Sequence, residues 1–149
     1  MVAWPGISVA LATSALLLLA LPAPAATVRV PADRPTIQLA LDAAVAGDTV
    51  LVAPGEYAGP ENQNLDFHGR DLVLRSEAGP EATILDGEFV ARAFYLHSGE
   101  TNAAVIEGFS VLRGMASYID PFGSVGGAAV CAGASPTFKN CILGACGAG

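Results

Sequence analysis

The stretch PTIQLALDAAVAGDTVLVAPGEY, residues 35–57, changes its apolar periodicity halfway along. Its first half has apolar residues at the helical spacing i, i+3, i+4, i+7, i+8, and these residues are Ile37, Ala40, Leu41, Ala44 and Val45. Pro35 suits the first turn of a helix, and Gly47 suits the position just after its end. Val50–Val52 then follows the pattern of a strand. We therefore predict a helix over Pro35–Val45 that leads directly into a strand.

That strand belongs to a series of short β-rich triplets that recur at one constant interval. The triplets are Val28–Val30, Val50–Val52, Leu72–Leu74 and Phe94–Leu96, and the pair Ile84 and Ile106 keeps the same interval. Strands that recur at one interval, with too little helix between them for βαβ units, are typical of a solenoid whose coils stack in parallel. An antiparallel sandwich fits less well, because Asn-Gly and Asp-Gly hairpin turns rarely occur at the right places.

Stacked coils place equivalent residues in columns, and alternate residues of each strand face the core. The predicted inward columns are entirely apolar: Val28/Val50/Leu72/Phe94 and Val30/Val52/Leu74/Leu96. The predicted outward column, Arg29/Leu51/Val73/Tyr95, is apolar at three of its four positions. Beyond Leu96 the spacing lengthens. We expect an inserted loop over Met115–Gly126, and Phe138–Cys141 repeats the pattern of Ile106–Phe109 at an interval longer than that of the triplets.

The predicted helix has a simple role in such a fold. The first coil of a solenoid exposes an apolar end and unpaired strand edges, which invite aggregation. A helix with one apolar face, inserted between the first two strands, can cover that end. We therefore interpret Pro35–Val45 as an N-terminal cap.

The segment 1–25 predicts a secretory signal peptide. Ile7–Leu21 is almost continuously apolar, and Ala23-Pro24-Ala25 is an A-x-A cleavage signal, although no Lys or Arg precedes the apolar run. The alternative is an uncleaved membrane anchor, but this run is shorter than the roughly 20 residues that a spanning helix needs. We expect cleavage after Ala25 and export to the cell surface, the medium or the periplasm, with no membrane contact after cleavage and one domain over residues 26–149.

Charge and cysteine content narrow the range of partners. The net charge is −7 and there is no basic patch, which argues against nucleic acid or an anionic membrane as a partner. Cys131, Cys141 and Cys146 lie close together near the end of the sequence. An exported chain can form disulfides, and three cysteines allow one bridge with one thiol left over. Small buried core residues are an equally good interpretation of these cysteines.

The quoted stretch and three later runs resemble a known family. The later runs are DLVLRSEAGPEATILDG, AFYLHSGETNAAVIEGFSVLRG and SPTFKNCILG. Together they resemble the N-terminal part of bacterial secreted right-handed parallel β-helix proteins of the pectin-lyase-like superfamily. The resemblance implies an all-β fold, a right-handed parallel β-helix (a solenoid of about 22-residue coils) with an N-terminal capping α-helix. It also implies a longer protein, so we expect this chain to be truncated and its open last coil to self-associate.

A polysaccharide lyase needs a base and a cation at one place. Arg75 and His97 are separated by the interval of the triplets, so the predicted register stacks them at one strand end. Solvated corner residues are the commoner explanation of such a pair. Tyr95 could stack on a sugar ring, although packing is the commoner role of a tyrosine on a strand.

A glycosidase needs two carboxylates flanking the scissile bond. Asp86, Glu88 and Glu107 fall near equivalent corners, and Asp66 precedes Glu88 by the interval of the triplets, so these form the only plausible acidic cluster in the sequence. Asp86 and Glu88 could also contribute oxygen ligands to calcium, but no calcium-loop motif supports this. The two histidines of the chain lie too far apart to match a structural zinc spacing. We therefore assign no catalytic, cofactor-binding or metal-ligating residue.

Three functions remain open at this level. We favour an exported structural module, or one that binds a polysaccharide or a cell-surface protein, because no convergent polar site is visible. The first alternative is the N-terminal part of a polysaccharide lyase or glycoside hydrolase that acts on acidic polysaccharide. The second is a segment of an adhesin-type surface protein. Fold resemblance does not choose among them.

Overall fold

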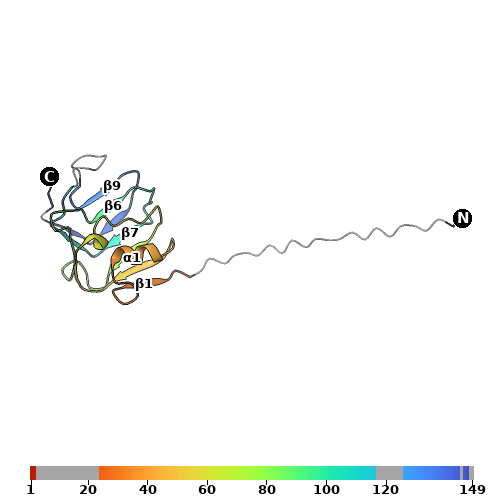
Figure 1. Ribbon diagram of the computed structural model, residues 1–149, viewed down its shortest axis with the longest axis horizontal. Coiled ribbons are helices and arrows are strands. Elements are labelled where there is room, and N and C mark those ends of the chain that lie inside the picture. Colours follow the sequence, from red (N-terminus) through yellow and green to blue (C-terminus); the bar gives the residue numbers. More distant parts are fainter. Residues whose placement is uncertain (3–23, 117–125, 145, 148–149) are drawn as a thin grey trace.

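The computed structural model describes residues 1–2, 24–116, 126–144 and 146–147. They form a mostly β parallel solenoid of about three turns with one short helix near the N-terminal end (Figure 1). The predicted signal segment Ile7–Leu21 and most of the predicted loop Met115–Gly126 lie outside the described residues. Within the described part of the chain, no helix is long and apolar enough to cross a membrane.

Within the described residues, the solenoid has three parallel sheets. The first contains β1 (Thr27–Val30), β2 (Thr49–Val52), β4 (Val73–Ser76), β7 (Val105–Glu107) and β10 (Thr137–Lys139), in that order. The second has the order β3 (Gly55–Tyr57), β5 (Thr83–Asp86), β8 (Ser110–Leu112) and β11 (Ile142–Leu143). The third pairs β6 (Phe94–Leu96) with β9 (Ala129–Cys131). Figure 1 shows β1 at one end of the solenoid and β9 at the other.

The uniform coil length predicted from the sequence is wrong beyond the first turn. Thr27 pairs with Thr49 at the predicted interval, but Thr49 pairs with Val73, which lies slightly further along the chain than that interval allows. Val73 pairs with Val105, and Val105 pairs with Thr137. Both pairings have the longer interval that separates Ile106–Phe109 from Phe138–Cys141. The sequence predicted this longer interval only for the last pairing. The strands still pair in parallel, but the corners between them are longer than predicted, and this shifts the register. Coil length therefore varies with the loops.

This change of register rearranges the predicted columns. The inward column observed in the first sheet is Val28/Val50/Leu74/Ile106/Phe138. Phe94–Leu96 lies in another sheet, and Ile84 is paired with Ser110 instead of Ile106. The register partner of Val52 is Ser76, whose buried hydroxyl lies 2.6 Å from the hydroxyl of Thr83. A polar residue is tolerated in this column because it has a hydrogen-bond partner.

The predicted outward column is also wrong. The observed column is Arg29/Leu51/Arg75/Glu107/Lys139. Charged residues follow Leu51 in this column, where the sequence predicted Val73 and Tyr95. Two ion pairs cross it or flank it, Arg75–Glu107 at 2.9 Å and Arg29–Glu77 at 3.0 Å. This face is charged, where the sequence predicted a mostly apolar one.

The predicted helix is present as α1 (Ile37–Ala43), somewhat shorter than Pro35–Val45. Ile37, Ala40, Leu41 and Ala44 are buried as expected, whereas Val45 is 63% exposed. The helix packs against β1, β2 and the 3-10 helix η1 (Pro60–Asn62). The side-chain oxygen of Asn62 accepts a 3.0 Å hydrogen bond from the backbone N–H of Ile37, which satisfies a donor that the helix itself leaves free. Helix α1 therefore packs on the strand at the N-terminal end of the first sheet.

Candidate functional site

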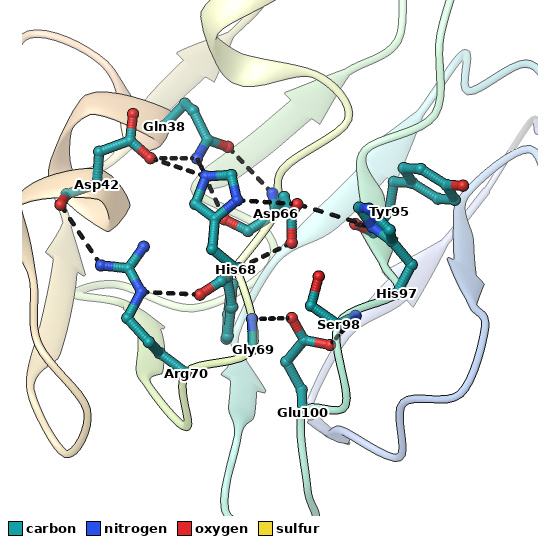
Figure 2. Close-up of polar contacts among 11 residues, drawn as sticks. Gln38, Asp42, Asp66, His68, Gly69, Arg70, Tyr95, His97, Ser98 and Glu100 are labelled. Atoms are coloured by element: carbon teal, nitrogen blue, oxygen red, sulfur yellow. Dashed lines mark hydrogen bonds and ion pairs between the residues drawn. The ribbon is translucent and has the colours of Figure 1, made fainter.

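A polar cluster lies where α1 meets the corner that follows the strand-like residue Leu65 (Figure 2). Its centre is Asp66, whose Oδ1 accepts a 2.8 Å hydrogen bond from the backbone N–H of His68 and whose Oδ2 lies 3.1 Å from Nδ1 of the same histidine. His68 adopts a left-handed backbone conformation with φ of 53°. This conformation is unfavourable for most residues other than glycine, and the double contact with Asp66 offsets its cost.

Helix α1 supplies the second side of the cluster. Asp42 Oδ1 lies 3.2 Å from Nε2 of His68, so the imidazole bridges two carboxylates. Gln38, one helical turn before Asp42, donates a 2.8 Å hydrogen bond to its Oδ1. The same glutamine accepts from the backbone N–H of Asp66 at 3.0 Å and donates to its carbonyl oxygen at 3.1 Å. The helix is therefore attached to the second turn through its polar face.

The next turn of the solenoid supplies the third side. His97 follows β6, and its Nδ1 lies 3.7 Å from Asp66 Oδ2, on the opposite side of that carboxylate from His68 (Figure 2). The His97 ring stacks on Tyr95 with centroids 4.3 Å apart and planes at 14°. The guanidinium carbon of Arg92 lies 5.4 Å from the centroid of the Tyr95 ring. His97 is 39% exposed, so part of the stacked pair reaches solvent beside a carboxylate.

A buried glutamate fixes the two corners relative to each other. Glu100 is 2% exposed, and its carboxylate accepts hydrogen bonds from the backbone N–H of Gly69 at 2.8 Å and of Ser98 at 3.1 Å. Gly69 has φ of 73°, and a β-carbon there would lie 2.8 Å from the carbonyl oxygen of Ser98. Only glycine allows this close approach. The buried Glu100 and the glycine at position 69 thus position His68 and His97.

The arrangement is suited to hydrogen bonding rather than to proton transfer by His68, because both of its ring nitrogens already face carboxylates. Within the described residues, no group of three or more His, Cys, Asp or Glu side chains is arranged to hold a metal ion. We call the exposed surface formed by Gln38, Asp42, Asp66, His68, Tyr95 and His97 the histidine surface.

The lyase pair considered from the sequence is not assembled. Arg75 lies in the first sheet and contacts Glu107 at 2.9 Å, while His97 contacts Asp66. The two residues are separated because Phe94–Leu96 belongs to a different sheet from Val73–Ser76. The lyase hypothesis based on Arg75 and His97 therefore loses its geometric basis.

The carboxylates of the predicted acidic cluster also contact different groups of the protein. Asp86 is buried and forms an ion pair with Arg113, and its Oδ1 also accepts from the backbone N–H of Glu88 at 2.8 Å. Glu88 accepts from Gln63 at 2.9 Å, and Glu107 pairs with Arg75. Asp66 belongs to the histidine surface. Asp86 and Glu88, the residues considered for calcium, are thus occupied by protein donors.

Cys131, Cys141 and Cys146 are free thiols. Cys141 and Cys146 are half-buried against the core, as the alternative interpretation of the cysteines expected, whereas Cys131 is exposed. Partial desolvation of its sulfur, with a smaller contribution from the negative charge of Glu100, raises the pKa of the Cys131 thiol.

The histidine surface was not predicted, although the sequence carries a signal for it. His68 and His97 are separated by the same number of positions as Leu65 and Phe94, which form a parallel bridge. The two histidines therefore occupy equivalent places on successive turns. The shorter interval taken from the triplets hid this relationship.

No family model, no curated protein and no solved structure matches this chain.

Proposed function

We propose that this chain is an exported, non-catalytic solenoid module that binds a glycan through the histidine surface. The observation that carries the proposal is the flat Tyr95–His97 stack, which lies beside the Asp66 carboxylate and is exposed at His97. A sugar ring has an apolar face of C–H groups and a rim of hydroxyl groups. A flat aromatic surface suits the face, and carboxylate and amide oxygens suit the rim.

The polar groups of this surface are held in fixed positions before any ligand arrives. Asp66 is tied to His68 through two contacts, and Gln38 joins Asp42 to the backbone of Asp66. Groups that are already ordered lose little conformational freedom on binding, and this favours affinity. Asp42 and His68 are 46% and 55% exposed, so their outer edges can still meet a ligand.

Binding is favoured over hydrolysis because the carboxylates considered for catalysis form contacts within the protein. Asp86 pairs with Arg113 and Glu107 pairs with Arg75. A glycosidase pair needs one carboxyl free to protonate the leaving group and the other free to act as nucleophile or base. The acidic histidine surface also suits a neutral or basic glycan better than a polyuronate.

Export rests on the apolar segment Ile7–Leu21 and the cleavage signal at Ala23–Ala25. We also propose kinship with the pectin-lyase-like superfamily, supported by the three-sheet parallel solenoid and by the helix placed between its first two strands. A crystal structure with left-handed coils would exclude that kinship. Release of the mature chain from a bacterial host, followed by N-terminal sequencing, tests export.

Glycan binding is tested by titrating neutral, basic and acidic oligosaccharides into the protein in a calorimeter. We expect a neutral or basic oligosaccharide to bind, and the His97→Ala substitution to weaken binding about tenfold through loss of the stacking surface. Glu81→Ala, at an exposed position away from this surface, is the matched control and should leave affinity unchanged. Absence of binding to every oligosaccharide, or equal affinity in His97→Ala, contradicts the proposal.

A further inference from the structure

The hydrogen-bond donors of the histidine surface are used within the protein. Gln38 Nε2 donates to Asp42 Oδ1 at 2.8 Å and to the carbonyl oxygen of Asp66 at 3.1 Å. The side-chain oxygen of the same glutamine accepts from the backbone N–H of Asp66 at 3.0 Å. Both ring nitrogens of His68 face carboxylates. The donors of these two side chains are therefore directed at protein acceptors.

The acceptor that Asp42 contributes is open. Its contacts with Gln38 and His68 both involve Oδ1, and none of the described residues donates a hydrogen bond to Oδ2. The side chain of Asp42 is 46% exposed. Its second oxygen is therefore available to a donor on a ligand.

His97 contributes another acceptor. Its Nδ1 lies 3.4 Å from the carbonyl oxygen of Tyr95 and 3.7 Å from Asp66 Oδ2. A neutral imidazole carries its proton on one nitrogen only, and the two acceptors beside Nδ1 favour that position. Nε2 of His97 is then an acceptor. The hydroxyl of Tyr95 can donate or accept.

The charge that this surface exposes is negative, since Asp42 and Asp66 contribute two carboxylates. Two arginines lie nearby. Arg92 is 2% exposed, and Arg70 directs its Nε and Nη1 at backbone carbonyl oxygens, at 2.9 Å and 2.5 Å. A ligand on the histidine surface therefore meets acceptors and negative charge.

We propose that the glycan bound by the histidine surface carries free amino groups, so that its units are amino sugars in the ammonium form. This inference rests on the glycan-binding function proposed above. An ammonium group has three donors and no acceptor, and its hydrogen bonds to a carboxylate are roughly twice as strong as neutral ones. The ammonium group contacts Asp42 Oδ2, while another sugar of the same glycan stacks on His97.

The two contacts belong to neighbouring parts of the solenoid. Figure 2 shows Asp42 and His97 on opposite sides of His68. His68 and His97 follow Leu65 and Phe94, which are bridge partners on successive turns. Strands paired in this way lie about 4.8 Å apart. A glycan that runs across the turns can therefore meet the stack and the carboxylate with different sugar units.

N-acetylation should discriminate strongly between otherwise identical ligands. It removes the positive charge of the amino group and adds a carbonyl oxygen, which only accepts hydrogen bonds. An acceptor that loses water without gaining a donor costs free energy. We therefore expect this surface to prefer the free amine to the N-acetylated sugar.

Calorimetry on the full chain tests the preference at about pH 7, where an unperturbed histidine is mainly neutral. The probes are the tetrasaccharides of glucosamine and of galactosamine, each with free amino groups and each fully N-acetylated. We expect at least one free-amine tetrasaccharide to bind about tenfold more tightly than its N-acetylated form. High salt should reduce this affinity ratio, because it screens exposed charges.

Substitutions locate the ammonium group. Asp42→Asn keeps a side-chain oxygen beside Gln38 and removes the charge, so the affinity ratio should fall toward one. Glu81→Gln removes the same charge at an exposed position away from this surface, and it should keep the ratio. His97→Ala should weaken the binding of both forms by the same factor, because stacking does not involve the amino group.

The possible results separate the amino-sugar assignment from the glycan-binding function. The assignment is overturned, and glycan binding stands, if the N-acetylated forms bind at least as tightly as the free amines or if only glycans without amino groups bind. A ratio that persists both in Asp42→Asn and at high salt overturns the contact between the ammonium group and Asp42. Absence of binding to every glycan overturns the proposed function itself.

Discussion

The backbone nitrogen of Ala26 lies 2.8 Å from Oδ1 of Asp48, a residue well beyond it in the sequence. The other oxygen of this buried carboxylate accepts a 2.9 Å hydrogen bond from the backbone N–H of Val45. Asp48 thus links Ala26, the residue before β1, to Val45, which follows α1. Asp48 itself lies directly before β2. The hydrogen bonds from Val45 and Ala26 lower the pKa of the Asp48 carboxyl below its ordinary value of 3.8.

This lowered pKa predicts a specific acid sensitivity. A carboxyl with a lower pKa in the folded state stabilises the fold fully above its unfolded pKa, and this stabilisation is lost as the pH falls through the folded value. We expect Asp48→Asn to be less stable than wild type at neutral pH and to show a weaker loss of stability below pH 3.8. Thermal unfolding followed by circular dichroism across this range measures both effects. Parallel curves for the two proteins would contradict the role of Asp48.

Signal cleavage after Ala25 would change the same contact. Ala26 would become the N-terminal residue, and its α-ammonium group would replace the backbone N–H beside Asp48. Hydrogen bonds between ionised groups are roughly twice as strong as neutral ones. We expect a chain that begins at Ala26 to unfold at a higher temperature than one that retains Ala25. In the Asp48→Asn background this difference should disappear, and a difference that persists would show that Asp48 is not its cause.

The close approach of two corners under the histidine surface gives a prediction about Gly69. Gly69→Ala introduces a β-carbon 2.8 Å from the carbonyl oxygen of Ser98 at a residue with φ of 73°. We expect a loss of about 2 kcal/mol or more in the free energy of unfolding, from backbone strain and this contact. Gly99→Ala is the control, because Gly99 has φ of 88° and its β-carbon would meet nothing within 4 Å. Equal losses in the two variants, measured by urea denaturation, would exclude the contact as a cause.

The observed register predicts an energetic coupling that the register inferred from the sequence does not. Arg75 and Glu107 are register partners with an ion pair of 2.9 Å. A double-mutant cycle with Arg75→Ala and Glu107→Ala should give a coupling of roughly 0.5 kcal/mol, the usual size for an exposed pair. The cycle between Arg75 and His97 is the control, and it should give no coupling. A larger coupling in the control would restore the register inferred from the sequence.

The parallel solenoid was predictable because each strand has a local signal and these signals recur along the chain. Short apolar strands and an amphipathic helix are visible in 35–57 without knowledge of the rest of the chain. The register was not predictable beyond the first step, since corners of different length add residues without changing the pattern of the strands. Val52 therefore faces Ser76 instead of the expected Leu74, and Leu51 faces Arg75 instead of Val73.

The histidine surface depends on that register and on the position of the helix. Gln38 and Asp42 are ordinary polar residues on the exposed face of a helix, and nothing in their spacing reveals that His68 lies beside them. The pairing of His68 with Asp66 is different, because residues two apart around a tight corner can form such a contact locally. A site assembled from three turns can be found from sequence only after each coil length is known.

The free thiols provide a last prediction. Cys131 is exposed whereas Cys141 and Cys146 are half-buried, so we expect iodoacetamide to modify Cys131 first in dilute protein. Only the thiolate reacts, and partial desolvation of the sulfur together with the charge of Glu100 raises the pKa of Cys131. The reaction should therefore accelerate at a higher pH than for a free cysteine, and Glu100→Gln should lower that pH. Mass spectrometry of peptides from a pH series measures the order and the profile.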